Sequence, residues 1–257
     1  MSQAISPYRE YPPSARLSRF VECFWTYENH SSGVHRVLPD GCADLLLVRT
    51  QREIQELFVV GTMTCGQLVD VSNTSTLGVR FRPGTLPLFI RIPGVEIVDQ
   101  RIRLAEVWGA KSDALNEELA EHSITSCVTQ IEKYLANQLN SEHNDQPFLN
   151  STQHVLFWAE RQHGNVRIDD LARIAGISTR HLRRVCLDLT GLTPKELCRA
   201  IRFRHAAARI SHASQVNWAD AALDSGYFDQ AHFINEFRAL GGLTPSEYKA
   251  ELSRLQL

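Results

Sequence analysis

The chain has 257 residues, of which 43% are hydrophobic and 22% charged, and its formal net charge is -2. This composition excludes a collagenous, fibrous or largely disordered protein, and the length predicts two domains. The longest aliphatic run, Leu45–Val48, is far shorter than the ~20 apolar residues that cross a bilayer, and the N-terminus has no apolar signal core. We therefore expect a cytoplasmic protein without a membrane partner.

The six cysteines are widely spaced and form no C-x-x-C pair. This spacing argues against a disulfide scaffold and against a four-thiolate zinc site. We expect no metal and no cofactor, and cysteines that serve as small core residues in a reducing compartment.

Residues 20–84 alternate between apolar and polar side chains in short runs that turn residues separate. A period of two is typical of half-buried strands, and several short strands in succession predict a small sandwich or a cupin-like barrel. We place this β-rich regulatory or sensor domain at residues 1–110.

Two arginines share one face of the last strand in this region, while Val79 and Phe81 share the other face. With the carboxylates and the thiol of an earlier loop, they form a candidate pocket for an anionic or polar ligand. The residues of this candidate ligand site are Arg80, Arg82, Asp40, Cys42 and Asp44. The alternative, which we rank first, is that the two arginines pair at the surface with Asp44, Glu96 or Asp99.

Residues 112–139 carry leucine, valine and isoleucine at helical spacing, with a break near residues 123–126. The pattern predicts two helices that either pack on the β-rich domain or pair with a second subunit, so that the protein is a monomer or a homodimer. The polar segment 138–146 precedes Pro147 and is typical of an interdomain linker. Residues 111–149 are thus assigned to a helical connector and linker.

Residues 150–257 contain two copies of one unit. The segment GLTPKE at 191–196 recurs as GLTPSE at 242–247, and a second match lies upstream in each copy. Each copy has a short helix, a turn at glycine and a second helix, which is the geometry of a helix-turn-helix.

The two units cover about residues 168–190 and 217–240. Between them, residues 195–211 contain no glycine or proline and predict one rigid connector helix. Such a connector would hold the two units in a fixed register on one face of DNA.

Positive charge is concentrated in this region, where residues 180–209 hold eight basic side chains and two acidic ones. The resulting field attracts polyanions and favours duplex DNA as the partner. The side chains expected to hold phosphate are Thr179, Lys195, Arg199, Arg202 and Arg204. For any one of them, a solvated helix face is the alternative.

At these residues the chain resembles the AraC family of bacterial transcription regulators. The strongest signature is ALDSGYFDQAHFINEFRALGGLTP at residues 222–245. The resemblance implies that the base-reading residues are Arg180, Arg183 and Arg184 in the first unit and Gln230, Ala231 and Asn235 in the second. Arginine is common in the family where Asn235 stands, so we expect the first unit to supply most of the sequence-specific energy.

Parts of residues 8–110 resemble a poorly characterised domain found in front of AraC-type DNA readers. The segments that carry this resemblance are YPPSARLSRFVECFW, RVLPDGCADLLL and GVRFRPG. The resemblance implies a regulatory domain without naming its signal.

The predicted fold class is therefore α+β, with a β-rich cupin-like or sandwich domain, a helical connector and an all-α domain with two helix-turn-helix units. The predicted function is that of a sequence-specific DNA-binding transcription regulator, not an enzyme, whose N-terminal domain senses a small ligand or mediates dimerisation. Expected partners are double-stranded promoter or operator DNA, a small-molecule effector and RNA polymerase. Two alternatives stay open: an enzyme such as a cysteine-dependent DNA-repair methyl acceptor fused to an AraC-type reader, and a ligand-independent DNA-binding protein.

Overall fold

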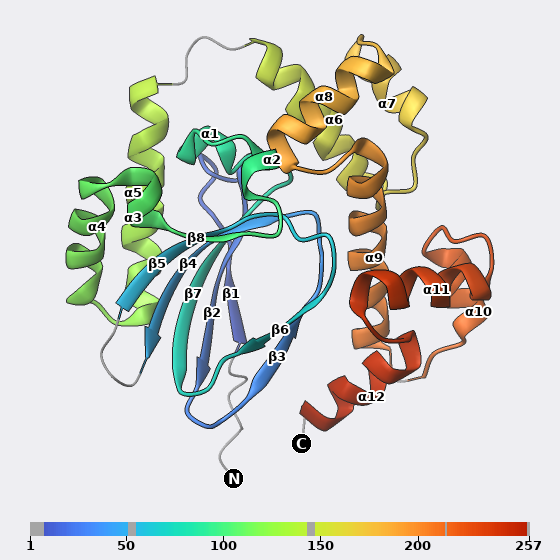
Figure 1. Ribbon diagram of the computed structural model, residues 1–257, viewed down its shortest axis with the longest axis horizontal. Helices are drawn as coiled ribbons and strands as arrows, with labels where there is room; N and C mark the ends of the chain where they lie inside the picture. Colours follow the sequence, from blue (N-terminus) through green and yellow to red (C-terminus); the bar gives the residue numbers. More distant parts are fainter. Residues whose placement is uncertain (1–7, 51–54, 143–146, 214, 256–257) are drawn as a thin grey trace.

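The N-terminal domain is built on an antiparallel sheet of six strands (Figure 1). The computed structural model describes residues 8–50, 55–142, 147–213 and 215–255. The strands run across the sheet in the order β1 (Tyr8–Tyr11), β2 (Val21–Asn29), β7 (Thr74–Phe81), β4 (Ala43–Thr50), β5 (Gln55–Val60) and β8 (Arg101–Arg103). A separate two-stranded ribbon pairs β3 (Val34–Val37) with β6 (Gln67–Asp70). The expected β-rich first domain is confirmed.

The two faces of the sheet have different surroundings. One face, which includes Phe24, Leu47 and Val79, is buried against helices in a single hydrophobic core. Those helices are α1 (Pro87–Ile90), α2 (Gly94–Ile97), α3 (Leu104–Trp108), α4 (Ala110–Ala120) and α5 (Ile124–Glu142). The opposite face carries Trp25 and Asp44 and looks toward the ribbon and the C-terminal domain. Strand alternation thus divides a buried core side from a second side that is open to ligands.

The segment expected to be a linker is partly helical. The break between α4 and α5 ends at Ser123, whose Oγ accepts a hydrogen bond of 3.2 Å from the Ser126 amide in the first turn of α5. Because Ile131 and Leu135 anchor α5 in the core, the helix continues to Glu142 and takes in the first part of the expected linker 138–146. Residues 143–146 lie outside the described part of the chain.

The C-terminal domain is helical throughout its described residues. It consists of α6 (Pro147–Arg161), α7 (Ile168–Ala175), α8 (Thr179–Thr190), α9 (Pro194–His212), α10 (Trp218–Asp224), α11 (Gln230–Gly241) and α12 (Pro245–Leu255). The pairs α7–α8 and α10–α11 lie where the two helix-turn-helix units were expected, and α9 lies where the connector was expected.

The repeated GLTP segments end one helix and begin the next. Gly191 and Gly242 have φ angles of 74° and 78° and terminate α8 and α11, in a backbone conformation that glycine adopts without strain. Thr193 then caps α9, since its Oγ1 accepts from the Glu196 amide while Glu196 Oε2 accepts from the Thr193 amide at 2.8 Å. Thr244 and its partner three residues later repeat this capping box at the start of α12. The sequence repeat is therefore a repeated helix boundary.

The two units share α9 as a common core element. Leu197 and Ile201 of α9 belong to the hydrophobic cluster of the first unit, whereas Phe203 and Ile210 belong to that of the second. Figure 1 shows α9 standing beside the sheet, with α7 and α8 near one end and α10 and α11 along the other. The positions of the two units are thus fixed relative to each other through one helix.

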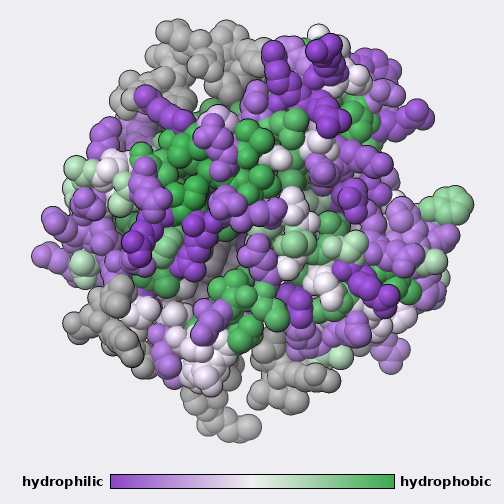
Figure 2. All heavy atoms as spheres, viewed as in Figure 1, coloured by the Kyte–Doolittle hydropathy of each residue, from purple (hydrophilic) through white to green (hydrophobic). Residues whose placement is uncertain are grey.

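Figure 2 shows hydrophobic surface gathered toward the middle of this face of the molecule, with hydrophilic side chains around it. Among the described residues, no helix has the length and apolar character that a membrane span requires.

Phe237 and Phe228 offer a matched test of the second core. Phe237 is fully buried, with its ring 4.7 Å from that of Phe203, whereas Phe228 is 86% exposed. We expect Phe237→Ala to lower the free energy of unfolding by about 3–5 kcal/mol. Phe228→Ala should change it by about 0.5 kcal/mol or less. Urea unfolding followed by circular dichroism measures both, and equal losses would contradict this assignment of the core.

Candidate nucleic-acid interface and effector cavity

The second helix of the first unit begins at a capped turn. Ser178 Oγ accepts a hydrogen bond of 3.2 Å from the His181 amide and so satisfies one of the free donors at the start of α8. Leu182, Val185 and Cys186 bury one side of α8. The other side of the helix is left to solvent.

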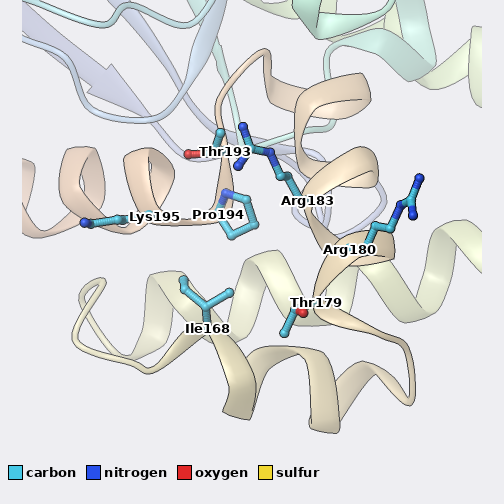
Figure 3. A pocket seen from close by; sticks show the side chains of 7 residues that line it. All are labelled: Ile168, Thr179, Arg180, Arg183, Thr193, Pro194 and Lys195. Carbon is cyan, nitrogen blue, oxygen red and sulfur yellow. The ribbon is translucent and has the colours of Figure 1, made fainter.

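Arg180, Arg183 and Arg184 of α8 are all exposed. Arg180 and Arg183 line an open hollow of about 460 Å³ together with Thr179 and Lys195. Figure 3 shows both arginine side chains leaving α8 and Lys195 leaving the start of α9. The structure thus brings four of the residues expected at DNA to one concave surface.

The second unit presents a less charged surface. Asp229 caps α11, since its Oδ1 accepts from the His232 amide at 2.7 Å. The three expected base-reading residues, Gln230, Ala231 and Asn235, are exposed on α11. None of the three carries a charge, which leaves the first unit as the more cationic reader.

Two arginines of α9 expected at phosphate have partners inside the C-terminal domain. Arg199 forms an ion pair with Glu236 of α11. Arg202 stands over the Tyr227 ring, 5.5 Å from its centroid, and donates to the Gly164 carbonyl at 3.4 Å. These contacts give both arginines partners within the C-terminal domain and hold α9 to its neighbours.

Arg204, the third such residue, bridges the two domains instead. Its Nη1 donates to Glu22 Oε2 at 3.0 Å in β2, and its Nη2 donates to Glu160 Oε1 at 3.1 Å in α6. Cys42 Sγ lies 3.2 Å from Nη1. The carboxylate oxygens of Glu22 and Glu160 and the Cys42 sulfur are atoms that could hold a metal ion, and they lie within 4.8 Å of one another. In this structure the Arg204 guanidinium lies among them. A phosphate role for Arg204 therefore gives way to an interdomain ion pair.

The two carboxylates on Arg204 differ in their environment. Burial raises the pKa of Glu160, whose side chain is 8% exposed, and Arg204 offsets only part of that rise. Burial acts in the same direction on Glu22, which is 32% exposed, but Arg204 and Arg80 together bring its pKa below the ordinary value. The more accessible carboxylate is thus the one held more firmly in its ionised form.

A cavity of about 600 Å³ lies between the open face of the sheet, the ribbon and α9. Four of the five residues of the candidate ligand site, Asp40, Cys42, Asp44 and Arg80, are in its lining. Burial raises the pKa of Asp44 to about 6, and its Oδ1 accepts a hydrogen bond of 3.1 Å from Trp25 Nε1.

The arginines of that candidate site are already paired. Arg80 Nε lies 3.4 Å from Asp40 Oδ2, and Arg82 Nη1 lies 3.5 Å from Glu160 Oε2. Arg82 is not in the cavity lining, and its Nε donates to the Ser18 carbonyl at 2.8 Å. Pairing, the alternative ranked first, is what the structure has. Asp44, one of the acids named from the sequence, faces Arg80 across β4 and β7 and stabilises its charge, whereas Asp40 and Glu160 were not among those named.

Both DNA-reading helices end against the N-terminal domain. Gly94 in α2 lies so close to Gly191 at the end of α8 that a β-carbon on Gly94 would be 2.6 Å from the Gly191 nitrogen. At the end of α11, the Gly66 amide donates to the Leu240 carbonyl at 2.6 Å, and Arg36 Nη1 donates to the Gly241 carbonyl at 3.2 Å. The first domain therefore contacts both readers directly.

Sequence analysis missed Glu22, Glu160 and Glu236, which decide where the α9 arginines point. Glu22 and Arg204 are 182 residues apart, and no local pattern signals such a pair. The Thr-x-x-Glu spacing in each GLTP repeat did carry a readable signal, that of a capping box.

Arg204 and Arg209 provide a test of the interdomain ion pair. Arg204→Met removes one cation from Glu22 and Glu160 and leaves Glu160 with Arg82 at 3.5 Å, and we expect a loss of about 1–3 kcal/mol in the free energy of unfolding. Arg209 pairs with Asp224 at the surface, where both side chains are about half exposed, so Arg209→Met should cost about 0.5 kcal/mol or less. Calorimetry of the full chain measures both. Adding Glu160→Gln to Arg204→Met should restore part of the loss, and equal effects of the two arginine variants would contradict the assignment.

The chain is similar to known proteins in each of its two domains. A helix-turn-helix domain model matches residues 171–251, and a domain of unknown function (DUF6597) matches residues 9–103. The probable transcription factor PqrA of Proteus vulgaris is 30% identical over 103 residues, which are 39% of this chain and 84% of PqrA. The HTH-type transcriptional regulator GlxA of Rhizobium meliloti (strain 1021) is 35% identical over 79 residues, which are 31% of this chain and 24% of GlxA.

A solved structure is similar to the C-terminal domain. It is a transcriptional regulator from Chromobacterium violaceum, described by its AraC-type DNA-binding domain, with a TM-score of 0.38 and 21% identity over 41% of this chain and 95% of that one. PqrA is matched over most of its length, and the helix-turn-helix model spans most of both units. The chain belongs to the AraC-type family of helix-turn-helix transcription regulators.

Proposed function

We propose that this DNA-binding regulator reads its site mainly through the first turns of α8, with α11 as a second and weaker reader, and that a small molecule in the cavity controls the reading. The observation that carries the proposal is the cluster of exposed cationic side chains around the hollow at the start of α8. N-terminal residues of a recognition helix are the ones that meet base edges in the major groove.

The roles of the base-reading residues follow from their donors and acceptors. Arg180, Arg183 and Arg184 each offer a planar fork that matches the O6 and N7 acceptors of guanine. In α11, Gln230 and Asn235 suit adenine, and Ala231 suits a thymine methyl group. Charge and fork geometry favour the first unit as the main source of specificity.

Thr179 and Lys195 are the proposed phosphate contacts. Both are exposed and stand at the starts of α8 and α9, where free backbone amides and the helix dipole also favour an anion. A phosphate held there would set the register of α8 on the duplex without selecting a base.

The N-terminal domain acts on the readers through its contacts with the ends of α8 and α11 and through Arg204. Since α9 residues line the cavity, a molecule bound there touches the helix that both units share. Binding changes DNA affinity only if the two arrangements of the protein hold the molecule with different affinity. An enzyme of the methyl-acceptor type is disfavoured because five of the six cysteines are buried and isolated from the DNA-reading hollow.

Arg183→Ala tests base reading. Selection from randomised duplexes with the unchanged protein first defines the preferred sequence. The variant should then lose about 1–3 kcal/mol of discrimination at one or two positions, while its affinity for unrelated DNA changes little. Arg103→Ala, on an exposed arginine of β8 paired with Glu56, is the matched control and should keep the full preference. A uniform loss across all sequences would make Arg183 a phosphate contact instead.

Lys195→Ala tests the phosphate assignment. It should weaken binding to preferred and unrelated duplexes alike and reduce the slope of log affinity against log salt by about 1. Titrations at several salt concentrations measure the slope. An unchanged slope would remove Lys195 from the interface.

A further inference from the structure

The cavity between the sheet and α9 has features that specify what it can hold. Its volume of about 600 Å³ suits a small organic molecule. The chemistry of its lining differs from one part to another. Aromatic rings come from the open face of the sheet and from the ribbon, and charged side chains lie near the end where Arg204 enters. The chemistry of the two parts together restricts the ligand.

The aromatic part of the lining is centred on Trp25. The indole packs directly onto Gly78 in the neighbouring strand, where a β-carbon would lie 2.0 Å from Trp25 Cε2. The Tyr8 ring is 6.0 Å from the indole, centroid to centroid, and Tyr27 pairs with His35 at 5.9 Å. Burial lowers the pKa of His35 and so favours the neutral form of its ring. Four rings therefore line one region of the cavity, and none of them favours a charged form.

Carboxylates outnumber guanidinium groups in the cavity lining. Asp44 is buried directly beside Trp25 and accepts a hydrogen bond from the indole at 3.1 Å. The charged residues in the cavity lining are the acids Glu10, Asp40, Asp44, Asp70 and Asp99 and the bases Arg36, Arg80, Arg101 and Arg204. Five acids thus face four bases in the lining, and two of the bases, Arg80 and Arg204, already have carboxylate partners.

The other two arginines of the lining are engaged as well. Arg36 is paired with Glu251 at 3.2 Å, and Arg101 lies over the Phe58 ring at 3.8 Å. An anionic ligand would therefore have to take an arginine from its partner and add negative charge to an acidic site. A cationic ligand meets neither obstacle.

We propose that the cavity binds a small organic cation, an ammonium group on an apolar body, with the ammonium against the face of the Trp25 ring and beside the Asp44 carboxylate. This inference rests on the proposed effector role of the cavity and names the class of effector. Aromatic rings attract ammonium groups through the negative face of the π system, and the attraction is stronger where water is excluded. The ammonium would also lie next to the Asp44 carboxylate, whose charge is otherwise offset mainly by Arg80 in the neighbouring strand.

The position of the ligand explains how it would reach the DNA-reading units. Arg204, Ala207, Ala208 and Ser211 of α9 line the same cavity. A ligand cation near Asp44 also competes electrostatically with Arg204 for the acidic cluster. Occupancy is thereby linked to the interdomain ion pair that holds α9 against the sheet.

The test uses four probes of similar size and different charge, namely benzyltrimethylammonium, benzylammonium, benzyl alcohol and benzoate, with the full-length protein and titration calorimetry. We expect the two cations to bind about tenfold or more tightly than the alcohol and the benzoate. Asp44→Asn and Trp25→Leu should each weaken the cations by about threefold to thirtyfold, whereas Trp25→Phe, which keeps a ring, should retain most of the affinity. Asp113→Asn, on the exposed side of α4, is the control and should bind like the unchanged protein.

Binding of duplex DNA, measured on the same preparations, shows that each variant is folded and separates this inference from the proposed function. If benzoate or benzyl alcohol binds as well as the cations, if neither cation binds, or if Asp44→Asn and Trp25→Leu bind the cations unchanged, the inference is wrong. A protein that selects DNA but ignores both cations keeps its proposed reading function and loses only this ligand class. A protein that binds the cations but selects no DNA keeps this ligand class and loses its proposed reading function.

Discussion

The burial of α9 on several sides is the constraint on which the arrangement of this protein depends. Leu197 and Ile201 pack into the first helix-turn-helix unit, Phe203 and Ile210 pack into the second, and Arg204 reaches the N-terminal domain. Each of these contacts uses a different part of one rigid helix. A shift of α9 against the sheet must therefore move both DNA-reading units, whereas neither unit can shift alone without opening its own hydrophobic core.

The contacts between the two domains include ion pairs and close backbone approaches, whereas the core of each helical unit is apolar. Within each unit, buried aliphatic and aromatic side chains hold the helices together. Between the domains, ion pairs at Arg204 and Arg36 and close backbone contacts at Gly94 and Gly66 accompany the apolar packing of Val98 and Leu38 against the helical units. Charged groups regain hydration when such an interface opens, so it separates at less cost than an apolar core. This difference suits the proposed role of the N-terminal domain in responding to a bound ligand.

Periodicity and local chemistry in the sequence were sufficient to predict the helices, their exposed faces and the turns between them. The apolar stripe of α8 predicted that Arg183 and its neighbours face solvent, and the glycine turns placed both units within about a residue of their observed ends. The sequence did not predict the partners of Arg199 and Arg204. Glu236, Glu22 and Glu160 come from distant segments that only the folded chain brings together. An arginine that faces solvent and an arginine that another domain covers can occupy the same position in a helical pattern. Helical spacing therefore does not distinguish the two.

Arg199 has a partner within the C-terminal domain that gives it a role apart from any contact with DNA. It pairs with Glu236, which stands next to the proposed base-reading residue Asn235 on α11 and is 11% exposed. An unpaired carboxylate at that position would repel the phosphate backbone and would also be costly to bury. The ion pair removes both problems and at the same time fixes α11 to α9. In the proposed mode of DNA reading, α11, whose proposed base-reading residues are uncharged, thereby keeps a fixed position relative to α9 while the arginines of α8 supply the charge.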